Sequence, residues 1–126
     1  MQLPRPSSCG TFHITKTGER IYSNKFDWVL PFHNPGLAPV GDASGSYHID
    51  LKGMPLYAER YQRTFGYYDG LASVVMDDKW FHIDENGKIV FGKDWDWAGN
   101  FQSGFCVVRK DSKMFHINKQ GNVLND

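Results

Sequence analysis

An aromatic-His-Ile triplet occurs four times along the chain at a nearly constant spacing. The copies are Phe12-His13-Ile14, Tyr47-His48-Ile49, Phe81-His82-Ile83 and Phe115-His116-Ile117, separated by 35, 34 and 34 residues. Four copies at one period indicate a tandem repeat. Its units must stack on their neighbours, because a single unit of this kind cannot bury its apolar face alone.

Glycines recur in step with the triplet. One follows each anchor aromatic by six residues (Gly18, Gly53, Gly87 and Gly121), and a second opens a later segment (Gly36, Gly70 and Gly104). The chain therefore reads as a single repeat domain, residues 11–126, with units at about 11–45, 46–79 and 80–113 and a partial unit at 114–126. Residues 1–10 lie outside the array, and Pro4 and Pro6 predict a loose N-terminal segment there.

The third unit shows most clearly what each unit folds into. Residues 79–84 are rich in β-formers, Gly87 supplies a turn, and residues 88–91 read as the returning strand of a hairpin. Residues 95–101 alternate aromatic with polar or small side chains, as in a half-buried strand, and residues 105–110 form a further strand. We predict an all-β fold of short antiparallel strands and hairpins, either an open twisted array or a meander partly closed into a barrel.

Charge and composition exclude several classes of protein. Fourteen basic residues balance fourteen acidic ones, which argues against nucleic-acid binding, since that requires a clustered excess of Lys and Arg. No apolar run approaches the roughly 20 residues of a membrane span, and the first residues lack the apolar core of a signal peptide. Two cysteines, Cys9 and Cys106, make no disulfide framework. We expect a cytoplasmic protein without membrane contact, and secretion by a non-standard route stays open.

Residues 78–88, Asp-Lys-Trp-Phe-His-Ile-Asp-Glu-Asn-Gly-Lys, resemble the core of the bacterial WG repeat, also called the KWG repeat. Residues 68–74 and 101–110 resemble its Gly-Leu-Ala-x-Val part, and the likeness extends over residues 11–124. The chain departs from the family at its signature, because Phe81 stands where the family has the Gly after Trp. It looks like a divergent variant with an aromatic-His-Ile core. The resemblance implies tandem β-rich repeats, no assigned reaction, and a role in binding or scaffolding.

The four equivalent histidines are the strongest candidates for polar chemistry: His13, His48, His82 and His116. A row of them could form a metal or anion site across repeats. Metal ligands must converge within about 2 Å of one ion, whereas stacked units spread equivalent residues along an axis. We therefore favour a structural role, in which each imidazole hydrogen-bonds turn backbone or a nearby Asp50, Asp84 or Asn118, and we expect no cofactor.

Exposed aromatic side chains are the candidate binding surface, formed by Trp28, Trp97, Tyr67 and Tyr68. Arg63 occupies the position of Trp28 and Trp97 in the second unit, which suggests that this position tolerates exposure to solvent. Aromatic side chains on a surface are typical of protein interfaces and can also stack on sugar rings.

The functional prediction is a non-catalytic repeat module that binds another protein or peptide, or acts as a scaffold. The alternative is a carbohydrate-binding module. A hydrolase would have to use His33 or the carboxylates of Asp77, Asp78, Asp94 and Asp96. No nucleophile motif accompanies them, and we interpret them as solvated turns and strand faces, so an enzyme is not expected. Homo-oligomerisation through exposed ends of the array stays open.

Overall fold

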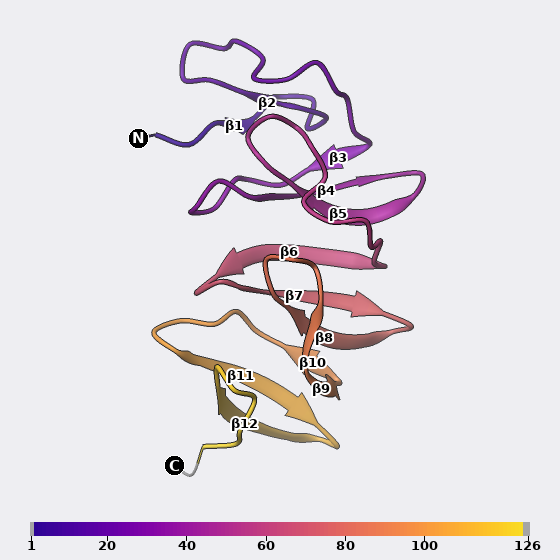
Figure 1. Cartoon of the computed structure of the whole chain (residues 1–126), viewed down its shortest axis with the longest axis vertical. Coiled ribbons are helices and arrows are strands. Elements are labelled where there is room, and N and C mark those ends of the chain that lie inside the picture. Colours follow the sequence, from indigo (N-terminus) through magenta and orange to yellow (C-terminus); the bar gives the residue numbers. More distant parts are fainter. Residues whose placement is uncertain (1, 125–126) are drawn as a thin grey trace.

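The computed structural model describes residues 2–124, and within them every regular element is a β-strand. Short antiparallel sheets are stacked along the long axis of the molecule, from the N-terminal end to the C-terminal end (Figure 1). The strands are β1 (Arg5–Pro6), β2 (His13–Ile14), β3 (Trp28–Val29), β4 (Ala38–Asp42), β5 (Gly45–Ile49), β6 (Arg63–Tyr68), β7 (Leu71–Met76), β8 (Lys79–Ile83), β9 (Ile89–Trp95), β10 (Trp97–Ala98), β11 (Phe105–Lys110) and β12 (Lys113–Asn118).

Each sheet after the first combines strands from two successive sequence units. The sheets have the orders β1-β2, β3-β4-β5, β6-β7-β8-β9 and β10-β11-β12. The tight hairpins β4–β5, β7–β8 and β11–β12 cross the unit boundaries, so the anchor triplet of one unit closes the sheet begun by the unit before it. Separating neighbouring units would therefore break a hairpin as well as a packing interface.

Two-residue turns close the hairpins that cross the unit boundaries. Asp77 and Asp78 join β7 to β8 with φ of 53° and 62°, and Asp111 and Ser112 join β11 to β12 with φ of 52° and 67°. Two consecutive residues with positive φ are required by the type I′ turn, whose twist matches that of the flanking strands, and Asp tolerates this conformation better than most side chains. The predicted turn at Asp77 and Asp78 is confirmed.

Successive units approach most closely where a turn glycine lies against an aromatic ring. A Cβ atom added to Gly53 would lie 2.7 Å from Cγ of Tyr22, and one added to Gly121 would lie 2.5 Å from Cγ of Phe91. Gly87 meets Tyr57 in the same way. These glycines also have φ near 80°, so the repeated position needs Gly both for its conformation and for the space it leaves to the preceding unit.

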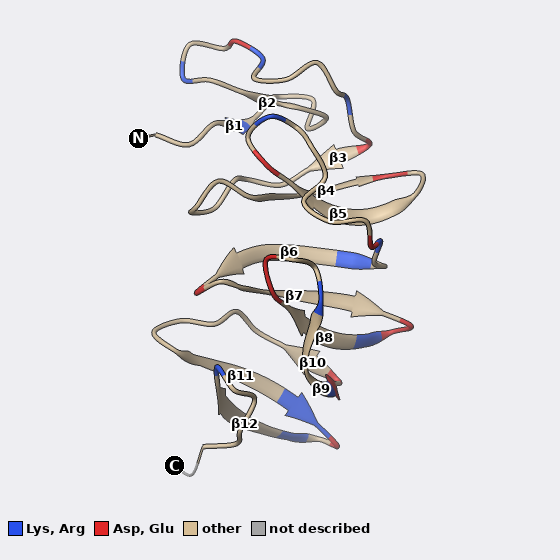
Figure 2. Ribbon diagram, viewed as in Figure 1, with Lys and Arg blue, Asp and Glu red and all other residues tan. Residues whose placement is uncertain are grey.

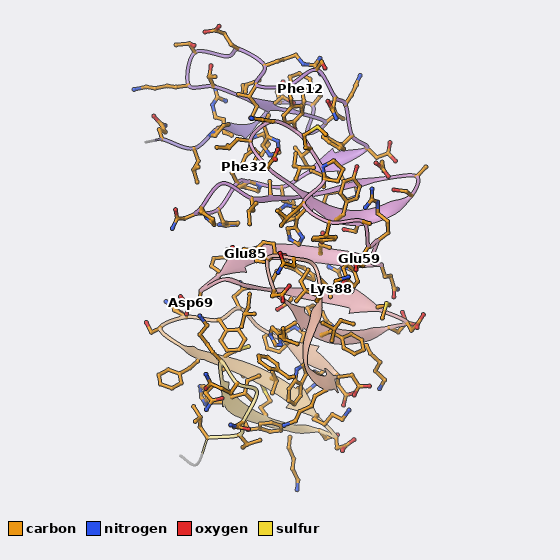
Figure 3. All side chains as sticks on the ribbon, viewed as in Figure 1. Phe12, Phe32, Glu59, Asp69, Glu85 and Lys88 are labelled. Carbon is orange, nitrogen blue, oxygen red and sulfur yellow. The ribbon has the colours of Figure 1, made fainter. Side chains whose placement is uncertain are left out.

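The core follows the stack in two clusters. The larger cluster extends from Tyr22 to Ile83, and the second extends from Leu71 to Ile117. Basic and acidic residues are interspersed along the stack (Figure 2). One pair, Glu59 and Lys88, joins successive units at an Nζ–Oε2 distance of 2.5 Å (Figure 3).

The all-β prediction is confirmed, and residues 2–124 form an open series of separate sheets with no closed barrel. The N-terminal segment requires a correction. Arg5 and Pro6 were expected in a loose segment, but they pair with Ile14 and His13 as an incomplete first sheet. Pro6 faces His13 as Pro39 faces His48, so this segment adopts the pairing of the repeat although its sequence does not show the repeat.

Candidate functional site

Two of the repeated histidines form the same hydrogen-bonded bracket. His13 Nδ1 lies 2.6 Å from the Tyr22 hydroxyl, and its Nε2 lies 2.8 Å from the carbonyl oxygen of Leu30. His48 repeats this with the Tyr57 hydroxyl at 2.6 Å and the Phe65 carbonyl at 2.7 Å. Because a carbonyl oxygen only accepts, Nε2 carries the proton, and the tyrosine hydroxyl donates to Nδ1. Each bracket thus fixes one tautomer.

Burial keeps these imidazoles neutral. His13 and His48 are both fully buried, with 0% of their surface exposed. Desolvation is the main effect: it lowers the pKa of His13 and lowers the pKa of His48 to about 4, while the hydrogen bond to the backbone carbonyl acts in the opposite direction. Burial also raises the pKa of the Tyr22 hydroxyl to about 12, so both partners remain uncharged at neutral pH.

An aromatic ring from the same unit covers each buried histidine. The ring centroids are 4.3 Å apart for His13 and Phe32, 4.5 Å for His48 and Tyr67, and 5.0 Å for His82 and Phe101. In units one and two, this aromatic lies two residues after the carbonyl that the histidine binds. The histidine therefore holds a returning extended segment through its backbone and through a side chain.

His82 departs from this pattern because Phe91 replaces the tyrosine. Its ring is 5.7 Å from that of Phe91, but its Nδ1 atom has no hydrogen-bond partner among residues 2–124. The other ring nitrogen, Nε2, lies 3.5 Å from Sγ of Cys106. Desolvation lowers the pKa of His82 to about 4, partly offset by a hydrogen bond to the Gly99 carbonyl.

The structural interpretation of the histidines therefore holds for these three residues, with different partners from those expected. The hydrogen bonds of the His13 and His48 imidazoles go to tyrosine hydroxyls and backbone carbonyls rather than to Asp50 or Asp84. The two aspartates accept backbone N–H groups of their own turns, for example Asn86 N–H on Asp84 Oδ1 at 2.9 Å. Residues 2–124 contain no group of three His, Cys, Asp or Glu side chains that could hold a metal ion. His13, His48 and His82 each contact an aromatic side chain of their own unit. His116 is exposed at the last sheet.

The predicted aromatic surface is only partly present. Trp28 and Trp97 are each 37% exposed. Tyr67 is wrong as a surface residue: it is 1% exposed, it covers His48, and its hydroxyl donates to the Asp84 carbonyl at 2.6 Å. Tyr68 is half-buried and lies 3.3 Å from His33 Nε2 through its hydroxyl. His33, expected in an exposed turn, is itself half-buried against Gly66.

A different set of side chains forms a continuous strip across two sheets. We call Arg63, Phe65, Trp80 and Trp97 the aromatic strip. The Phe65 and Trp80 rings are stacked at 5.1 Å and 12°, Trp80 and Trp97 lie 6.1 Å apart, and the Arg63 guanidinium lies 5.0 Å from the Phe65 ring. Phe65 was not predicted as a surface residue, because its repeat position is aromatic only in the second unit.

The strand carboxylates serve as ion-pair partners. Asp94 pairs with Lys110, and Asp96 lies 3.3 Å from Nζ of Lys79. Hydrogen bonds lower the pKa of both carboxyl groups: the bond from Lys110 is the main cause at Asp94, and the bond from the Asp111 N–H is the main cause at Asp96. Both carboxylates are thus ionised at neutral pH and each is held by a cation.

A family model described as the WG containing repeat matches residues 49–80 and 83–113, which together make half of the chain. The chain belongs to the WG repeat family. Both matches begin near an anchor triplet, so the WG repeat period and the period of the histidine brackets coincide. No curated protein and no solved structure gives a significant match to this WG repeat chain.

Residues 2–124 contain no helix with the length and apolar character needed to cross a bilayer.

Proposed function

We propose that this WG repeat chain is a non-catalytic module that binds a partner protein through the aromatic strip. The observation that carries the proposal is the stack of Phe65, Trp80 and Trp97, which crosses from one sheet to the next and is only half-buried. Trp97 keeps 37% of its surface accessible to solvent, so its indole is available for contact with another molecule. Trp and Arg are the residues most enriched among those that dominate binding energy in protein interfaces.

Charge indicates the chemistry of the partner. Among residues 2–124, neither Arg63 nor Arg109 forms an ion pair, and both are exposed. Arg109 lies opposite Trp97 in the register of β10 and β11, so an unpaired cation lies near each end of the strip. A protein surface that carries carboxylates around an apolar centre would complement this arrangement.

The test is capture of a partner with variants of the strip. Trp97→Ala and Arg63→Ala are compared with wild type in pull-downs from a lysate, and the captured protein is then purified and titrated against each. Trp28→Ala is the matched control, because Trp28 is equally exposed at 37% and occupies the same repeat position outside the strip. We expect the strip variants to bind about tenfold more weakly and the control to bind like wild type. Equal binding by all four proteins would refute the strip as the contact surface.

The carbohydrate alternative has one observation in its favour, the exposed indole of Trp97. Co-sedimentation with insoluble polysaccharides tests it with the same variants. Retention that is lost in Trp97→Ala and kept in Trp28→Ala would replace the protein-binding proposal with carbohydrate binding.

A further inference from the structure

The last sheet exposes a face that the two preceding sheets bury. Phe105 is 50% exposed, whereas the equivalent Leu37 and Leu71 are 7% and 9% exposed. His116 is exposed, whereas the equivalent His48 and His82 are 0% and 1% exposed. Both side chains, with Val107 and Leu124, line a cavity of about 650 Å³, which we call the terminal groove. Phe105, Val107 and His116 lie on β11 and β12, the strands at the C-terminal end of the stack (Figure 1).

The preceding sheets show what covers this face. On the sheet β3-β4-β5, the segment that contains Phe65 and Tyr67 supplies a carbonyl to His48 and a ring that packs on it. On the sheet β6-β7-β8-β9, Phe101 packs on His82 and the Gly99 carbonyl accepts the Ser73 hydroxyl at 2.8 Å. Ser73 is the equivalent of Val107, since each faces its histidine in the hairpin register.

The covering segments share one chemical pattern. A backbone carbonyl points at the histidine, and an aromatic side chain follows two residues later, as in Leu30 with Phe32 and Phe65 with Tyr67. The contact is made by main chain and one ring, so it depends little on the other side chains of the segment. It recurs at every junction from His13 to His82, which makes the terminal groove a continuation of an interface already present in the molecule.

We propose that the terminal groove binds an extended segment of another protein that carries an aromatic side chain. The aromatic ring enters the groove between Phe105 and Leu124 and packs on His116, as Tyr67 packs on His48. The backbone of the segment lies along β11 and β12. This site is separate from the aromatic strip and does not depend on the function proposed for it.

A peptide taken from the chain itself tests the proposal. The probe is a synthetic peptide of residues 61–70, which covers His48 within the molecule, added to the ¹⁵N-labelled full chain. We expect saturable chemical-shift changes centred on Val107, His116 and Leu124. A peptide with the aromatic at position 67 replaced, Tyr67→Ala, should bind about tenfold more weakly, because it loses the ring that fills the groove.

Two variants of the chain separate the outcomes. Phe105→Ala removes an exposed wall of the groove and should weaken the peptide without changing the fold, whereas Trp97→Ala alters only the strip and should leave peptide affinity unchanged. Absence of shift changes at the groove, or equal affinity of the two peptides, would overturn the proposal. Concentration-dependent dimerisation in analytical ultracentrifugation that Phe105→Ala abolishes would also overturn it, since a second copy would then be the occupant.

Discussion

Replacement of Phe91 by Tyr supplies the hydroxyl that the third histidine bracket lacks. The His82–Phe91 rings are 5.7 Å apart, the same centroid distance as His48–Tyr57. His82 is 1% exposed, and its Nδ1 atom has no hydrogen-bond partner among residues 2–124. A tyrosine at position 91 would place its hydroxyl where Tyr57 donates to His48 at 2.6 Å.

The expected gain follows from the energetics of buried polar groups. A net intramolecular hydrogen bond contributes about 1 kcal/mol, and satisfying a buried acceptor removes a penalty of about 1–3 kcal/mol. Small shifts of the imidazole in the present structure relieve part of that penalty. We therefore expect Phe91→Tyr to raise the free energy of unfolding by about 1–2 kcal/mol. For a chain of this size, that corresponds to an increase in Tm of about 4–8 °C.

Urea denaturation at pH 7.5, followed by circular dichroism, measures this change. The reciprocal variant Tyr57→Phe leaves His48 Nδ1 without its donor and should lower the free energy of unfolding by about 1–3 kcal/mol. If Phe91→Tyr proves neutral or destabilising while Tyr57→Phe destabilises as expected, the missing hydroxyl does not explain the difference between the units. If both variants are neutral, the bracket does not contribute to stability.

Three further predictions concern the repeat positions. Gly87→Ala should lower the free energy of unfolding by about 2–4 kcal/mol, because the new methyl group would collide with Tyr57. Gly70→Ala is the control: Gly70 has a similar φ of 81° with open space around it, so this variant should lower the free energy of unfolding by only about 1 kcal/mol. Equal losses in the two variants would exclude the steric explanation. Asp84→Ala should cost about 1 kcal/mol, because two turn N–H groups lose their acceptor; thermal melts that match wild type would contradict this. The free energy of unfolding should fall as the pH drops below about 6.5, because His48 and His82 bind protons in the unfolded chain but, with pKa values of about 4, not in the folded chain. The loss should approach about 1.4 kcal/mol per pH unit for each histidine. A urea midpoint that stays constant from pH 7 to pH 5 would rule this out.

The period of the repeat could be predicted from the sequence, but its phase could not. Units counted from the anchor triplet place boundaries at 45/46, 79/80 and 113/114, and each boundary falls within a hairpin. A periodic sequence has no intrinsic starting point, so the choice of unit says nothing about which strands share a sheet. The turns at Asp77-Asp78 and Asp111-Ser112 carried a local signal of the true phase, since each joins the strands on both sides of a unit boundary.

The partners of the histidines were also beyond local sequence reasoning. Tyr22 and Tyr57 follow their histidines by nine residues, and this recurrence is visible in the sequence, but Phe91 interrupts it in the third unit. In a strand with one face covered, alternation places successive residues in opposite environments. In a stack of sheets both faces are covered, so Tyr47, His48 and Ile49 are all buried. For the same reason Tyr67 was mistaken for a surface residue.

The aromatic strip could be predicted only in part from the sequence. Trp97 could be recognised as a surface candidate from its position, because Arg63 replaces it in the preceding unit. Its contact with Trp80 and the stack on Phe65 depend on how adjacent sheets meet, and no spacing along the chain encodes that geometry. The repeat thus predicts the core better than it predicts the binding surface.

The protonation state of the buried histidines is the most direct test of their structural role. Long-range ¹H–¹⁵N spectra of the folded protein at pH 5.5 report the tautomer and charge of each imidazole. We predict that His48 and His82 are neutral, with the proton on Nε2, and that the Nδ1 resonance of His48 shows a hydrogen bond that His82 lacks. Charged imidazoles at either position in the folded protein at this pH would contradict the account.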